Sequence, residues 1–238
     1  MSEEINSQAD RWADLALLWG VTLGPLVIGV TLSLGGVESG LTRNAASATV
    51  VLQLFQELIG LGVLAYVLRR QRRRLTDIGL SFRGTDIPKS LIIALVGYVA
   101  FFVVFNVLPP AMPSPGAAPQ GAEALRGLAS AHVVMLIVLV LVNPLYEELI
   151  CRAYPMGELE TLTGSKVVAV VCSAGVQGYY HLYQGWRWAV ASTALFLVLS
   201  LYFASARRAV PIVLAHFYFD ALGIYFLFRA YSSTTGSP

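Results

Sequence analysis

Two adjacent carboxylates, Glu147 and Glu148, follow an almost wholly apolar run of residues 129–142. An isolated charge at bilayer depth costs roughly 3 kcal/mol on insertion scales, and carboxylates inside membranes usually serve a function. On a helix, Glu148 and Arg152 are four residues apart and share a face, so they can form an ion pair. Glu147 points about 100° away and has no partner on the same helix. This spacing predicts one carboxylate that is held by a cation and one that is free to move protons, unless the residues form a surface ion-pair cluster past a helix end.

Two of the three histidines lie in later apolar segments of the chain. His181 ends one such segment, and His216 lies in another, four residues before Asp220 and on the same helix face. A buried carboxylate together with two imidazoles supplies a base for water and donors for a developing negative charge. Taken singly, His181 fits a hydrogen-bonded packing residue, and His216 with Asp220 fits a local ion pair.

Other polar residues receive simpler interpretations. Glu57, within an apolar segment, fits a helix–helix hydrogen-bond partner better than a second functional carboxylate. We interpret His132 as an interfacial residue. Cys151 and Cys172 lie in apolar stretches and form no zinc-binding pattern, and neither Cys-His nor Ser-His dyads are evident.

The composition is that of a multispanning membrane protein, with 56% hydrophobic residues, 13% charged residues and a mean hydropathy of +0.67. We predict an all-α fold with about seven transmembrane helices at residues 15–34, 49–68, 91–108, 132–162, 166–181, 188–206 and 210–228. Pro25 is expected to kink the first helix, Pro144 and Pro155 to bend the fourth, and Gly164 to end it. The predicted organisation is residues 1–128 for the N-terminal helices and basic loop, 129–230 for a core, and 231–238 for a tail.

The distribution of basic residues predicts the orientation in the cell membrane. With the loop of residues 69–89 inside, twelve Lys and Arg residues lie inside and four outside, as the positive-inside rule requires. The N-terminus is then cytoplasmic and the C-terminus outside. We interpret the basic run of residues 69–74 as a topology signal against the anionic leaflet, so the expected partners include membrane lipids and exclude nucleic acid.

The depth of the polar residues tests the length of the fourth helix. Glu147 lies about 15 residues, or ~22 Å, from a turn at residues 162–164, and His181 lies about 17 residues, or ~25 Å, beyond it. The two residues then meet at similar depth. If the helix stopped at Pro155, they would miss by about 10 Å, so we predict a long, bent helix that projects beyond the membrane.

The motifs Glu147-Glu148-x-x-x-Arg152, His181 and His216-x-x-x-Asp220, on successive helices, resemble those of the CPBP intramembrane proteases. This family includes the type II CAAX prenyl endopeptidases and bacteriocin-processing relatives. The resemblance covers roughly residues 133–222. Gln177 stands where the family usually has Phe, which we expect to alter packing around His181. Asp220 stands where Asn is often found.

The resemblance implies hydrolysis of a peptide bond inside the membrane. The substrate would be a membrane-associated protein or peptide, with a prenylated CAAX protein as one option. The resemblance implies that Glu147 is the general base and that His181 shares the water that Glu147 activates. It implies that His216 and Asp220 stabilise the oxyanion. The geometry of the site would be held by Glu148 and Arg152.

A metal-dependent mechanism is left open by the resemblance. Its ligands, with zinc as the candidate cofactor, would be Glu147, His181, His216 and Asp220. The sequence favours a metal-free site because it lacks cysteine ligands and the helical motif that places two histidine ligands on one helix.

Two other functions compete with a protease. Buried Glu, His and Asp residues also build the proton relays of transporters, although the sequence has no inverted repeat and no paired broken helices. An inactive binding or immunity scaffold of the same fold is the other alternative. The intact Glu-Glu-x-x-x-Arg motif argues against it, and Gln177 leaves it open.

Overall fold

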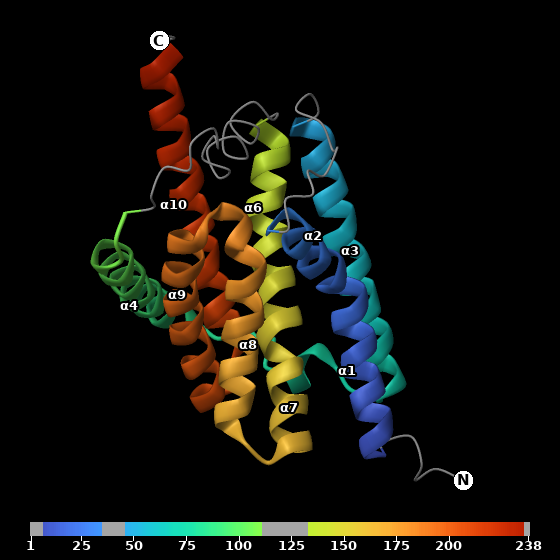
Figure 1. Ribbon diagram of the computed structural model, residues 1–238. Helices are drawn as coiled ribbons and strands as arrows, with labels where there is room; N and C mark the ends of the chain where they lie inside the picture. Colours follow the sequence, from blue (N-terminus) through green and yellow to red (C-terminus); the bar gives the residue numbers. More distant parts are fainter. Residues whose placement is uncertain (1–6, 35–45, 111–132, 236–238) are drawn as a thin grey trace.

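The computed structural model describes residues 7–34, 46–110 and 133–235, and these ranges contain helices and no strand (Figure 1). The protein is therefore an all-α, multi-pass membrane protein, as predicted. Its α-helices are α1 (Gln8–Thr22), α2 (Gly24–Leu34), α3 (Ala46–Arg70), α4 (Asp86–Val107), α6 (Val133–Glu148), α7 (Pro155–Thr163), α8 (Lys166–Tyr180), α9 (Trp186–Ala206) and α10 (Ala209–Thr235).

Five helical segments within the described ranges are long and apolar enough to cross a membrane. They are Val50–Arg70, Asp86–Val107, Val134–Thr163, Trp186–Ala206 and Ala209–Phe226, and the pair α1 and α2 makes a sixth if it counts as one bent span. The predicted fifth span corresponds to α8, which has only 15 residues and is shorter than the roughly 20 residues that usually span a bilayer. The count of seven spans therefore stays a prediction.

The first predicted span is bent where the sequence places Pro25. Helices Gln8–Thr22 and Gly24–Leu32 meet at 50°. Proline has no backbone N–H and its ring collides with the carbonyl four residues earlier, so the regular hydrogen-bond ladder cannot pass this point. The kink that the sequence predicted is confirmed.

The fourth predicted helix is one long segment with an interruption of a specific kind. Helix α6 passes through Pro144 and continues into a π-helical turn at Leu149–Ala153 (η3), and α7 begins at Pro155. Pro155 occupies the first position of α7, where a missing N–H costs no helical hydrogen bond. Gly164 ends α7 with a left-handed φ of 69°. The long helix and its end at Gly164 are thus confirmed.

The bundle places α6 and α7 among the other helices (Figure 1). Helix α8 packs against α7 and α9, α10 packs against α6 and α4, and α3 packs against α6 and α1. Gly178 permits a close approach of α8 to α9, because a Cβ atom there would overlap the side chain of Thr193. Close packing of this kind brings residues from α6, α8 and α10 into one buried layer.

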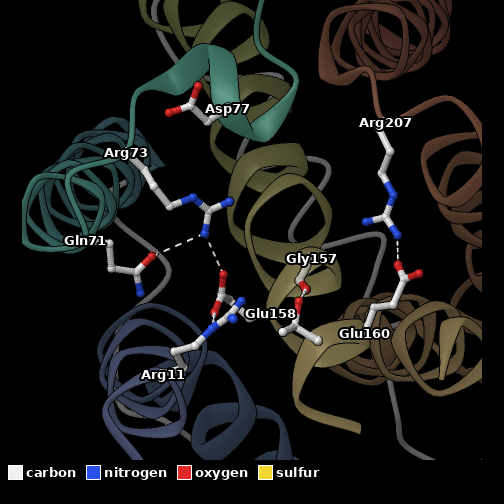
Figure 2. Close-up of a pocket in the computed structure, with 9 residues that line it drawn as sticks. Arg11, Gln71, Arg73, Asp77, Gly157, Glu158, Glu160 and Arg207 are labelled. Atoms are coloured by element: carbon white, nitrogen blue, oxygen red, sulfur yellow. Dashed lines mark hydrogen bonds and ion pairs between the residues drawn. The ribbon is translucent and has the colours of Figure 1, made fainter. Parts of the chain in front are cut away.

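Polar contacts join the helices at the end of the bundle where α7 terminates. Glu158 is fully buried, and its two carboxylate oxygens lie 2.7 Å from Nε of Arg11 and 2.6 Å from Nη1 of Arg73 (Figure 2). A cavity of about 560 Å³ lies beside them. Its charged lining residues, three basic and three acidic, are Arg11, Arg73, Arg207, Asp77, Glu158 and Glu160. The positive and negative charges around the cavity are equal in number. We therefore interpret these ion pairs as structural contacts that fix α7 against α1 and against the loop after α3.

A further ion pair, at the loop between α9 and α10, joins this region to α4. Nη2 of Arg208 lies 2.7 Å from Oδ2 of Asp86, whose side chain is fully buried. Hydrogen bonds to Asp86 raise the pKa of Arg208 above its ordinary value. The pair holds the start of α10, and therefore the helix that carries His216, against α4.

Candidate active site

Glu148 is the buried carboxylate on which the site is built. One of its oxygens, Oε1, lies 2.6 Å from Nη1 of Arg152 and 2.7 Å from Nδ1 of His216. Glu148 and Arg152 are completely buried, and His216 is 4% exposed. The ion pair that the four-residue spacing predicted is confirmed. Its carboxylate also contacts His216, which lies on α10.

Arg152 projects from the π-helical turn into a set of compensating contacts. Its Nε donates to Oγ of Ser200 at 3.2 Å, its Nη2 donates to Oε1 of Gln177, and its guanidinium carbon lies 5.2 Å from the ring centre of Phe196. A buried charge is tolerated only when it is paired and hydrogen-bonded. Partners from α6, α8 and α9 meet this requirement, so Arg152 connects three helices.

Glu147 has a different environment from its neighbour, although it is also buried, with 7% of its surface exposed. As predicted, its own helix gives it no ion-pair partner. Its Oε2 accepts a hydrogen bond from Nε2 of Gln177, which comes from α8. The same oxygen lies 3.8 Å from Nε2 of His216. Glu147 is therefore contacted by a neutral amide and faces an imidazole across a short gap.

Asp220 faces the same ring nitrogen of His216 as Glu147 does. Its Oδ1 is 3.6 Å from Nε2 of His216, and its Oδ2 accepts a hydrogen bond of 3.1 Å from Nδ2 of Asn143 on α6. The shared face of His216 and Asp220 on α10 agrees with their spacing. Nε2 of His216 thus points between two carboxylates, and both are beyond direct hydrogen-bond distance.

The ring of His181 packs against aromatic side chains. His181 follows the last residue of α8, and its ring stacks on Phe196 at 5.0 Å, while Phe196 lies 5.9 Å from the ring of His216. Its Nδ1 is buried and has no hydrogen-bond partner among the described residues. The residue of α8 that meets Glu147 is Gln177, one turn earlier. The π-helical turn explains part of this offset, because it holds more residues per turn than the regular rise assumed in the depth estimate.

Three contributors to the site were missed or underrated from sequence. Gln177 was expected to alter packing around His181, and the structure shows in addition that its amide bridges Arg152 and Glu147. Asn143 orients Asp220, and Ser200 accepts from Arg152. The available signal was the presence of polar side chains inside apolar segments, which usually find a hydrogen-bond partner when buried. The sequence does not say which partner each one meets.

The four proposed metal ligands are not assembled into one set. Within the ranges that the structure describes, no group of three or more His, Cys, Asp or Glu side chains is placed to hold a metal ion. The ring of His181 stacks on Phe196, which also packs against His216. The described residues therefore do not present the four side chains as one ligand set. His132 lies outside the described residues.

Comparison with known proteins identifies the same part of the chain. Residues 129–222 match the family model described as Type II CAAX prenyl endopeptidase Rce1-like. The match includes every predicted site residue, and it confirms the resemblance to this protease family. No curated protein and no solved structure matches the chain.

Proposed function

We propose that this chain, which carries an Rce1-like type II CAAX prenyl endopeptidase domain at residues 129–222, hydrolyses a peptide bond of a membrane-associated protein or peptide. In this proposal, Glu147 activates the water molecule. Glu148 and Arg152 hold the site residues in position. The different surroundings of the two adjacent glutamates support this division, since only Glu148 is in direct contact with an arginine.

The observation that carries the proposal is the gap of 3.8 Å between Oε2 of Glu147 and Nε2 of His216. This separation is too long for a direct hydrogen bond. It suits a water molecule that contacts both atoms, which is the usual interpretation of polar atoms slightly beyond hydrogen-bond distance. A water held there has a carboxylate on one side to accept its proton and an imidazole on the other.

In the proposed reaction, Glu147 removes a proton from this water as its oxygen attacks the carbonyl carbon of the substrate. The electron pair of the C=O double bond moves to the carbonyl oxygen, which becomes an oxyanion. His216 in its protonated form donates from Nε2 to that oxyanion, while Nδ1 donates to Glu148 and so fixes the ring. When the C–N bond breaks, the proton held by Glu147 passes to the leaving amine.

Asp220 and His181 have supporting parts in this proposal. Asp220 faces Nε2 of His216 at 3.6 Å and stabilises the protonated ring. His181 acts through Phe196, whose ring packs against both histidine rings. The proposed substrate class is a lipidated protein with a CAAX-type C-terminus, which follows from the description of the matching family.

The test is cleavage of a fluorogenic peptide by the purified protein in detergent, with farnesylated and unmodified CAAX-type peptides compared. Glu147→Gln should lower turnover by ~10²–10⁴-fold, the usual contribution of a general base. Glu160→Gln is the matched control, because Glu160 lies on α7 among Arg207 and Lys166, away from the site. Full activity of Glu147→Gln would refute the proposed base.

The transporter alternative is tested with the same preparation. Reconstituted vesicles containing a pH-sensitive dye should show no proton flux that depends on Glu147. Proton flux without peptide cleavage would replace the protease by the transporter, and neither activity would favour the binding scaffold.

A further inference from the structure

Gln177 is a fully buried amide between two charged residues of the site. Its Oε1 accepts a hydrogen bond from Nη2 of Arg152, and its Nε2 donates to Oε2 of Glu147. It projects from α8, whereas Arg152 and Glu147 belong to the π-helical turn and to α6. One neutral side chain thus connects the buried ion pair to the second glutamate.

The chemistry of the partners fixes the orientation of this amide. The two ends of a glutamine are often hard to distinguish, but an arginine has only donors and an ionised carboxylate has only acceptors. The amide oxygen must therefore face Arg152 and the amide nitrogen must face Glu147. Neither an apolar residue nor a carboxylate at position 177 would provide this acceptor and this donor together.

We propose that Gln177 is a positioning residue for Glu147, an inference that rests on the proposed role of Glu147 as the base. The oxygen that accepts from Gln177 is also the one that faces His216 at 3.8 Å. Two side chains near Glu147, Gln177 and Tyr180, could donate to it, and of these Gln177 is the one within hydrogen-bond distance. Without the amide, the carboxylate of Glu147 is held less firmly in its orientation. Gln177 therefore holds the base at the distance from His216 at which both contact one water.

A neighbouring serine of α8 allows this role to be separated from a purely structural one. Ser173 lies one turn before Gln177 on the same helix and is as fully buried. Its hydroxyl lies 3.3 Å from that of Ser200 on α9. Ser173→Ala thus removes a buried hydrogen bond between α8 and α9 and leaves the contacts of Glu147 and Arg152 in place, which makes it the matched control for Gln177→Met.

The experiment measures kcat, KM and thermal unfolding of both variants in the peptide assay. Gln177→Met should lower kcat by about 10–100-fold, the scale expected when a catalytic group is displaced by about 1 Å, with KM within about twofold of the parent. Ser173→Ala should lose thermal stability and keep kcat. Equal kcat in Gln177→Met and the parent, or a loss of kcat in both variants that follows their loss of stability, would overturn the proposal.

A second variant covers the case in which Gln177→Met does not fold. Gln177→Glu keeps an acceptor for Arg152 and replaces the donor toward Glu147 by a carboxylate, so it should fold and still lose kcat. Full kcat in a folded Gln177→Glu protein would also overturn the proposal.

The Glu147→Gln variant distinguishes an error in the role of Gln177 from an error in the role of Glu147. If Glu147→Gln is inactive and folded Gln177 variants are fully active, only the positioning role of Gln177 is wrong. If Glu147→Gln is fully active, the proposed function itself is wrong. When both proposals hold, Gln177→Met should cause no further loss in the Glu147→Gln background, because residues that act as a unit are not additive.

Discussion

Nδ1 of His216 lies 2.7 Å from Oε1 of Glu148, so a carboxylate on α6 fixes the ring of a histidine on α10. The same oxygen lies 2.6 Å from Arg152, whereas Oε2 of Glu148 has no hydrogen-bond partner among the described residues. One atom therefore joins the ion pair predicted from sequence to the imidazole that faces Glu147. The packing of α6 against α10 and the arrangement of the site depend on the same contacts.

The first prediction is that Arg152→Ala destabilises the fold more than Glu147→Ala does. Removal of Arg152 leaves Glu148 without its cation in a fully buried position, which costs roughly 3–5 kcal/mol. Removal of Glu147 costs about 1 kcal/mol, the value of the hydrogen bond lost by Gln177. Thermal unfolding in detergent should place Arg152→Ala on the order of 10 °C below the parent.

A control variant makes this ranking specific. Arg152→Lys keeps the charge but cannot reach Glu148, Gln177 and Ser200 together, so its stability should fall between those of the parent and Arg152→Ala. If Glu147→Ala unfolded at a lower temperature than Arg152→Ala, the assignment of the held and the free carboxylate would have to be exchanged.

The second prediction concerns Glu57, a carboxylate on α3 that is 2% exposed. Its Oε1 accepts from Gln53 at 3.0 Å, and its Oε2 has no hydrogen-bond partner within the described ranges. An incompletely satisfied buried carboxylate is costly, so Glu57→Gln should unfold at the parent's temperature or a few degrees higher, since about 1 kcal/mol corresponds to 2–4 °C in a chain of this size. Turnover should stay within twofold of the parent. A stable Glu57→Gln protein with lost turnover would instead identify Glu57 as a functional carboxylate.

Residue spacing predicted those contacts of the site in which both partners lie on the same helix. The pair Glu148 and Arg152, and the common face of His216 and Asp220, follow from residues four positions apart. The kink before Pro25 and the end of α7 at Gly164 follow from backbone chemistry that a proline or glycine always brings.

Contacts between helices were harder to predict, because they depend on how each helix is rotated and shifted relative to the next. The sequence placed His181 beside Glu147, yet the residue of α8 that reaches Glu147 is Gln177. A shift of one helical turn is enough to exchange these two residues. The π-helical turn Leu149–Ala153 changes the local rise and rotation of the segment, and no pattern in the sequence announced it.

The third prediction is the orientation in the membrane, which the fold alone does not set. A cysteine placed at Thr76, an exposed residue of the turn Leu75–Ile78 (η2), should react with a membrane-impermeant maleimide only after permeabilisation. A cysteine at Gly116, which lies outside the described residues, should react in intact cells. The parent protein is the control, because Cys151 is buried and Cys172 is partly buried. The reverse labelling pattern would place the basic loop outside and contradict the count of basic residues.

The last prediction is that the activity does not require a metal. Nε2 of His216 faces two carboxylates at 3.6 and 3.8 Å, and His181 stacks on Phe196. Within the described ranges, no group of three or more His, Cys, Asp or Glu side chains is placed to hold a metal ion. We expect enzyme that has been treated with a chelator and purified again to keep its turnover of the peptide. Asp220→Asn should keep much of it, because the amide oxygen can still face the ring of His216, and Asn143 can turn its own amide so that its oxygen accepts from the new NH2 group. Loss of activity on chelation with recovery on addition of zinc would establish a metalloprotease. Asp220→Asn should then raise the zinc concentration needed for half-maximal recovery, because a neutral amide is a poorer zinc ligand than a carboxylate.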